Sequence, residues 1–248
     1  MMNLTETVLY SCGISLFTSF GIQKVEAKRP NILFIMTDQQ RYDMLSCAGN
    51  RYVHTPSLDQ LAENGVRFER NYCANPVSMP SRFAMITGRF AGEIGYTNNS
   101  TKPDTLRVLP VARESSVGNL FRNAGYETIY SGYPGFYCGR TDITDYGFIQ
   151  NGMDFYDGPS NFAESFFAGY KPEEDKPFFL YLSFMNPHDI CYGAGFDPRF
   201  PDKLRPHQIA ATQKYINFRK TLSEEEYRNQ IPPVPANMEP NGAYAEMK

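Results

Sequence analysis

Three separate segments of the sequence carry side chains that could perform chemistry, and each follows a run of apolar or alternating residues. The side chains concerned are Asp38, Gln39, Ser78, Arg82 and His188. They offer a carboxylate and an amide, a hydroxyl with a guanidinium, and an imidazole. Ligand sites of open α/β sheets lie beyond the carboxyl ends of the strands. We therefore expect these side chains to meet at one sheet edge, in a site suited to an anion.

The outer two segments supply oxygen donors and a histidine. Asp38 and Gln39 carry the hard oxygen ligands that Ca²⁺ or Mg²⁺ prefers over zinc, although an aspartate after a strand is also a common turn or cap residue. His188 is the one histidine that follows a predicted strand. His54 precedes a predicted helix and His207 lies in a polar stretch, so both are expected to be structural or solvent-exposed.

The middle segment combines a hydroxyl with a cation at the start of a helix predicted over residues 81–86. Ser78 lies just before Pro80, which suits the first helical turn, where free N–H groups and the helix dipole favour a tetrahedral anion. The alternative is that Ser78 or Ser81 is only an N-cap. Arg82 would reinforce anion binding, or it is a solvated helix residue.

The elements that must position these groups alternate along the chain. Short apolar or alternating runs predict strands over 31–36, 66–72, 126–130 and 178–184, and the first is continuous enough for a strand buried on both faces. Helices are predicted over 56–64, with Thr55 as N-cap, 81–86 and 116–124. We predict an α/β fold with a mainly parallel sheet flanked by helices, and long surface loops over 131–175.

Composition supports a globular chain and excludes several partners. The 248 residues are 42% hydrophobic and 15% aromatic, which excludes a disordered chain, and 24 Lys+Arg balance 27 Asp+Glu, which leaves no basic footprint for nucleic acid. The cysteines contain no Cys-x-x-Cys pair, which argues against a zinc site and favours buried or free thiols. Beyond the N-terminal segment they are Cys47, Cys73, Cys138 and Cys191.

The N-terminal segment predicts export. The uncharged apolar run Val8–Ile22 is followed by small residues at the positions of a cleavage site after Ala27, so residues 1–27 are expected to be a signal peptide. The run is short for a membrane span, and we expect no stable membrane insertion. The absence of Lys and Arg before the run argues against this interpretation, and a retained anchor or a misassigned start are the alternatives. The mature protein would be periplasmic or secreted.

Three motifs give the sequence a specific resemblance. PNILFIMTDQQ, HTPSLDQLAENGVRFERNY and SMPSRFAMITGR resemble the type I sulfatase family of the alkaline phosphatase superfamily, over roughly residues 29–190. The family signature is Cys or Ser, any residue, Pro, Ser, Arg and, after a short spacer, Thr-Gly-Arg. The matching positions are Ser78, Pro80, Ser81, Arg82, Thr87, Gly88 and Arg89.

The resemblance implies a sulfuric ester hydrolase acting on a sulfated small molecule, aryl sulfate or glycan. Ser78 would be oxidised to formylglycine, whose hydrate attacks sulfur and later expels sulfate. Asp38, Gln39 and the modified Ser78 would hold Ca²⁺ or Mg²⁺, Arg82 would hold the diol, and His188 would bind the ester near the leaving oxygen. The serine form of the motif resembles those matured by an oxygen-independent radical enzyme, which implies that maturase as a partner and an anaerobic bacterial host.

Two departures from the family pattern stand out. Tyr133 occupies the place where a Gly-Lys-x-x-His motif would supply a lysine to the sulfate. No later Asp-Asn or Asp-His motif supplies further metal ligands. We therefore expect residues 28–190 to be the N-terminal part of a sulfatase catalytic domain and 191–248 a loop-rich, incomplete continuation. Activity of this C-terminally truncated chain alone is then in question.

Two alternatives remain open. A phosphoesterase or transferase of the same superfamily would act through unmodified Ser78. A non-catalytic sulfatase remnant would only bind sulfated glycans, or bind nothing. An ordinary serine hydrolase using Ser78 and His188 is disfavoured, because the sequence has no Gly-x-Ser-x-Gly elbow.

Overall fold

The structure is a computed structural model, and it describes residues 29–99, 110–133, 143–151, 157–172, 176–188, 213, 217 and 220–230. The chain divides into residues 1–31 and 32–248, and the fold reported below belongs to the second unit. The predicted signal peptide and the stretches 189–212 and 231–248 lie outside the described residues. So do Cys138, Cys191 and His207.

Four parallel strands form the sheet that positions the site. They are β1 (Ile32–Asp38), β2 (Glu127–Gly132), β3 (Ile149–Asn151) and β4 (Phe178–Pro187), and their order across the sheet is β1-β4-β2-β3. All three pairings are parallel, so the carboxyl ends of the strands share one edge. The prediction of a mainly parallel α/β sheet is confirmed.

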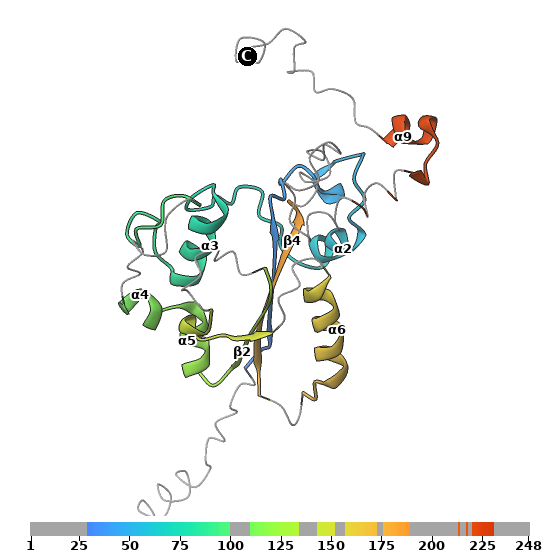
Figure 1. Cartoon of the computed structure of the whole chain (residues 1–248). Helices are drawn as coiled ribbons and strands as arrows, with labels where there is room; N and C mark the ends of the chain where they lie inside the picture. The colour runs from blue at the N-terminus through green and yellow to red at the C-terminus, as the bar shows by residue number, and fades with distance from the viewer. Residues whose placement is uncertain are drawn as a thin grey trace, which may run out of the picture. The chain divides into compact units, whose positions relative to one another are not determined.

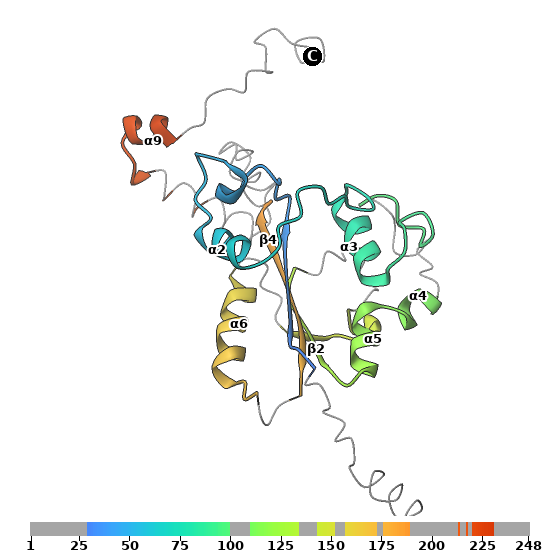
Figure 2. The same ribbon diagram turned by 180° about the vertical axis from the view of Figure 1, so that it is seen from behind.

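Helices cover both faces of this sheet. Helices α3 (Ser78–Thr87) and α5 (Val117–Asn123) lie on one face and α6 (Gly158–Gly169) on the other, as both ribbon views show (Figures 1 and 2). The remaining helices of the described residues are shorter or peripheral. They are η1 (Ser46–Ala48), α2 (Pro56–Asn64), α4 (Pro110–Glu114), η3 (Ile143–Tyr146) and α9 (Glu224–Gln230).

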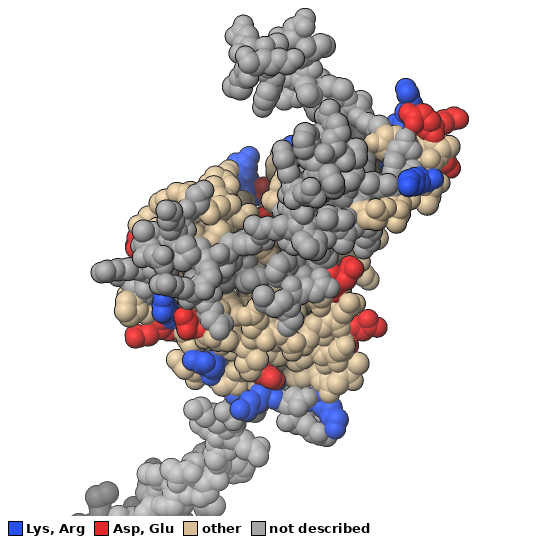
Figure 3. Space-filling model, viewed as in Figure 1, with Lys and Arg blue, Asp and Glu red and all other residues tan. Residues whose placement is uncertain are grey.

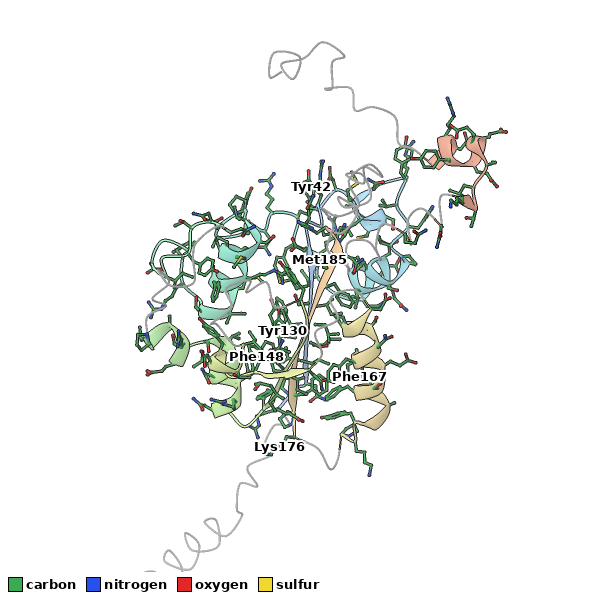
Figure 4. The ribbon with its side chains drawn as sticks, in the orientation of Figure 1. Tyr42, Tyr130, Phe148, Phe167, Lys176 and Met185 are labelled. Atoms are coloured by element: carbon green, nitrogen blue, oxygen red, sulfur yellow. The ribbon has the colours of Figure 1, made fainter. Side chains whose placement is uncertain are left out.

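Aromatic side chains fill the space between sheet and helices. On the α3 and α5 face, Tyr130 and Tyr181 stack with ring centroids 4.8 Å apart, and Phe148 meets Tyr130 edge-on at 5.9 Å. On the α6 face, Phe166 packs edge-on against Phe178 at 5.1 Å. Figure 4 shows Tyr130 and Phe148 on one side of the sheet and Phe167 of α6 on the other. This aromatic content therefore serves core packing.

Two strand predictions differ from the structure, one in its expected burial and the other entirely. Strand β1 forms where expected, but it is the edge strand of this sheet, and Leu33 and Ile35 are 44% and 49% exposed rather than buried on both faces. The alternating segment 66–72 forms no strand, and its Val66 and Phe68 are 79% and 77% exposed. Alternation alone does not make a strand, because strand stability depends on packing and on pairing with a neighbouring strand.

The prediction of long surface loops over residues 131–175 is also wrong. It contains η3, β3 and the whole of α6, whose apolar residues face the sheet. Thr55 is the N-cap of α2 and Pro56 is its first residue, as predicted, but the Thr55 hydroxyl bonds Ser46 and Asp59 instead of the helix backbone. Local polarity misled the loop prediction, because the packing of α6 against the sheet decides its conformation.

The visible surface of the described residues carries side chains of both charges. Figure 3 shows Lys and Arg interspersed with Asp and Glu on the visible face, without a patch of one sign. Cys47 and Cys73 are free thiols, as expected. Within the described residues, no helix has both the length and the apolar content that crossing a membrane requires.

Candidate active site

A hydroxyl, a carboxylate and a guanidinium meet where β1 ends and α3 begins. Asp38 is the last residue of β1 and is 8% exposed, while Ser78 is the first residue of α3. The Ser78 hydroxyl donates to Asp38, with Oγ 3.1 Å from Oδ1 and 3.3 Å from Oδ2. Arg82, one helical turn further along α3, donates from Nη2 to Asp38 Oδ2 at 3.3 Å. The sheet edge thus gathers groups that lie 44 residues apart in sequence.

Arg82 is a buried cation. It is 1% exposed, and its Nη1 donates to the Ser183 hydroxyl of β4 at 2.6 Å. The ion pair with Asp38 is buried as well, with side-chain exposures of 1% and 9%. A charge without water must be balanced by a counter-ion and hydrogen bonds, so Arg82 and Asp38 constrain each other. The alternative of a solvated helix residue is therefore wrong for Arg82.

The start of α3 is not built on a serine N-cap. The cap position is Val77, with no side-chain capping hydrogen bond, and the helix begins three residues earlier than predicted, at Ser78. The Met79 N–H donates to Asn99 Oδ1 at 3.1 Å. Because the Ser78 hydroxyl is directed to Asp38 instead of the helix backbone, the cap alternative does not hold for this residue.

The structure brings His188 and Gln39 to the same edge through the backbone. Asp38 pairs with Pro187 in the register of β1 and β4, and the His188 N–H donates to the Asp38 carbonyl oxygen at 3.1 Å. Gln39 adopts a left-handed conformation with φ of 64°, which turns the chain away from the strand directly after Asp38. Such a conformation costs a non-glycine residue about 1–3 kcal/mol and is typical of functional sites.

Comparison with known proteins identifies the family. The family model described as "Sulfatase" matches residues 30–229. The chain belongs to the sulfatase family. The N-acetylglucosamine-6-O-sulfatase of Bacteroides thetaiotaomicron is 35% identical over 130 residues, which are 52% of this chain and 22% of that relative. The chain thus spans only part of the curated sulfatase that it matches.

Solved structures agree with the sulfatase fold. A putative sulfatase from Bacteroides thetaiotaomicron VPI-5482 aligns with a TM-score of 0.57 and 24% identity, covering 68% of this chain and 38% of its own. A protein solved with its substrate D-glucosamine-2-N,6-O-disulfate aligns with a TM-score of 0.50 and 26% identity, covering 72% and 39%. The parallel sheet with its flanking helices is therefore similar in fold to part of these proteins.

We call the site formed by Asp38, Ser78 and Arg82 the corner. The oxygen atoms at this corner are of the kind that bind a divalent cation. Asp38 and Ser78 present oxygens within 3.3 Å of each other, and Gln39 adds an amide next in sequence. These are ligands of the kind that Ca²⁺ and Mg²⁺ take. The described residues contain no cluster of three or more His, Cys, Asp or Glu that could hold a metal. A full shell of six to eight oxygens would therefore need donors beyond this corner.

Sequence reasoning missed two partners of the corner. Ser183 is fully buried and accepts a hydrogen bond from Arg82, while Asn99 accepts the Met79 N–H in the first turn of α3. The sequence did offer a signal for Ser183, because it is the one small polar residue in the otherwise apolar and aromatic strand FFLYLSF. Asn99 had none, because it lies 20 residues from its partner.

Buried tyrosines surround the guanidinium. Burial raises the pKa of Tyr130, and the nearby Arg82 charge opposes that increase. Burial also raises the pKa of Tyr181, whose hydroxyl contacts the Met36 sulfur at 2.9 Å. Both phenols therefore stay neutral at physiological pH, and the net charge of the corner is set by Arg82 and Asp38.

Proposed function

We propose that this chain forms the nucleophile-bearing part of a sulfate ester hydrolase. The observation that supports the proposal is the contact of the Ser78 hydroxyl with Asp38, itself paired to buried Arg82, at the carboxyl end of β1. Ser78 is partly exposed, so a substrate or a maturing enzyme can reach it. Membership of the sulfatase family over residues 30–229 supports the same reaction class.

In this proposal Ser78 is converted to formylglycine by a radical maturase, and the aldehyde hydrate supplies the oxygen nucleophile. Asp38 accepts a hydrogen bond at the Ser78 Oγ position, so it can orient the nucleophile and take its proton. Arg82 donates a hydrogen bond to Asp38 and would add positive charge beside the place where the sulfate oxygens gather. Strand β1 carries Asp38 and helix α3 carries Ser78 and Arg82, so the fold would hold all three residues in place before substrate binds.

His188 and a divalent cation complete the proposed site. The backbone hydrogen bond from His188 to Asp38 supports a role for His188 at this site, in which its imidazole would bind the ester. Asp38 and Gln39 would hold Ca²⁺ or Mg²⁺ with ligands from water or from residues outside those described. The cation would neutralise the sulfate oxygens.

The proposed substrate is a sulfated sugar, with an aryl sulfate as a model compound. One relative is an N-acetylglucosamine-6-O-sulfatase, and one structural neighbour holds a sulfated glucosamine. Both point to a sulfated amino sugar. The proposed location is the periplasm or the exterior, after cleavage behind Ala27, which sequencing of the mature N-terminus would test.

The reaction class can be tested by comparing two esters. Sulfate release from 4-nitrophenyl sulfate and phosphate release from 4-nitrophenyl phosphate are measured with the full chain from a maturase-containing host. We expect sulfate to be released in preference, and Ser78→Ala to abolish the release. Preferential release of phosphate by unmodified Ser78 would instead establish the phosphoesterase alternative. Release from neither ester, with a folded protein, would favour the non-catalytic remnant.

A further inference from the structure

Arg82 has an aromatic partner in addition to the polar contacts of its guanidinium with Asp38, Ser183 and the Met36 sulfur. Its guanidinium carbon lies 4.8 Å from the ring centroid of Tyr133, which is 7% exposed. The single carboxylate contact, at 3.3 Å, is long for an ion pair, and the Arg82 Nε is buried without a hydrogen-bond partner within the described structure. The balance of this buried charge therefore depends strongly on the face of the Tyr133 ring.

The backbone holds Tyr133 in place. Its N–H donates to the Ser183 carbonyl at 2.8 Å, and its own carbonyl accepts the Tyr130 hydroxyl at 2.6 Å. The preceding Gly132 has φ of 99°, and a Cβ there would lie 2.2 Å from the Ser183 carbonyl oxygen. The glycine allows the chain to lie against β4, directly beside the strand residue that also bonds Arg82.

We propose that Tyr133 is a positioning residue that holds the Arg82 guanidinium in the plane facing Asp38 and Ser78. Ser183 and Asp38 fix two corners of the guanidinium, and the aromatic ring blocks its rotation and excludes water from one face. The effect of Tyr133 on catalysis rests on the proposed function. Its effect on the orientation of the Arg82 guanidinium does not.

The rotation rate of the Arg82 guanidinium tests directly whether Tyr133 holds it in place. In the full chain labelled with ¹⁵N-arginine, the two Nη signals of Arg82 are followed by NMR, with Arg82→Lys used to assign them. We expect slow rotation in the wild type and within about twofold in Tyr133→Phe, which keeps the ring. Tyr133→Leu should rotate about tenfold faster. Tyr133→Met removes the ring with a flexible apolar side chain and should behave like Tyr133→Leu.

The control is Tyr170→Leu, which removes a ring stacked on Phe166 on the opposite face of the sheet. It should leave Arg82 rotation unchanged. Equal rotation rates in Tyr133→Leu and wild type would overturn the proposal. The proposal would also be overturned if Tyr170→Leu accelerated Arg82 rotation as much as Tyr133→Leu does, because the acceleration would then reflect a general loss of packing.

Activity provides a second, separable readout. In preparations that release sulfate, Tyr133→Leu should lower kcat about tenfold with KM within twofold, and Tyr133→Phe should retain wild-type kcat. A KM effect alone would contradict a positioning role. Absence of sulfate release from the wild type would count against the proposed function, while the rotation rates would still decide the role of Tyr133.

Discussion

Coupling between Asp38 and Arg82 is the interaction on which the site depends, and a double-mutant cycle can measure it. Asp38→Asn leaves a guanidinium that is 1% exposed without a counter-ion, and Arg82→Met leaves a carboxylate that is 9% exposed. Removing one partner of a buried pair costs about 3–5 kcal/mol. The single contact of 3.3 Å and the remaining bond from Arg82 to Ser183 favour the lower end, about 3 kcal/mol for each.

The double variant should lose less than the sum of the two single changes. With no charge left to bury, we expect a total loss of about 4 kcal/mol and therefore a coupling energy of about 2 kcal/mol. Urea unfolding followed by far-UV circular dichroism measures this, since 3 kcal/mol shifts the midpoint by about 1.5 M at an m-value of about 2 kcal/mol/M.

The exposed pair Arg113–Asp145 is the matched control for this cycle. Its nitrogen and oxygen lie 3.6 Å apart, and both side chains are about two-fifths exposed. The cycle of Arg113→Met and Asp145→Asn should therefore show a coupling below about 0.5 kcal/mol. An equally small coupling for Asp38 and Arg82 would refute the reasoning, because the buried pair would then act as two independent residues.

Two further predictions concern the framework around the corner. Gly132→Ala should destabilise the protein by about 3 kcal/mol or more, because of the φ of 99° and the 2.2 Å approach to Ser183, whereas Gly92→Ala, with no atom within 4 Å of its Cβ, should change stability by less than about 0.5 kcal/mol; thermal unfolding of the two variants compares them. Burial raises the pKa of Tyr146 from 10.0 to about 12. The folded state then holds the proton more tightly, so stability present below pH 10 is lost as pH rises towards 12, by up to about 2 kcal/mol. Tyr146→Phe should show a smaller decline over this range in urea unfolding at each pH, and an unchanged slope would contradict the argument.

Much of the sheet could be predicted because its strands carry their own signal. The segment Phe178–Phe184 is apolar throughout and lies in the middle of the sheet, where β1 and β2 cover both of its edges. Helix α5 could be predicted from its end signals, because Ser116 lies at its N-terminal cap and Gly125 follows its C-terminal end. Segment 66–72 failed because alternation describes a strand face without supplying the neighbouring strand. Helix α6 was missed because glycine, proline and serine at its start resemble a loop.

The corner itself was partly accessible from sequence. Asp38, Ser78 and Arg82 follow or open predicted elements, so the topology of a parallel sheet was enough to place them near each other. The burial of Arg82 could not be predicted, because it depends on Ser183 and Tyr133, which approach from two other strands. Such contacts join residues 101 positions apart, a separation at which local pattern carries no information.

The mass of one tryptic peptide tests the central claim most directly. Cleavage after Arg70 and Arg82 releases Asn71–Arg82, which contains Ser78. In protein made alongside a serine-type radical maturase, we predict a form of this peptide that is lighter than the unmodified one by two hydrogens, with the change located at Ser78 and absent in Ser78→Ala. A peptide that carries only serine after full exposure to an active maturase would contradict the account.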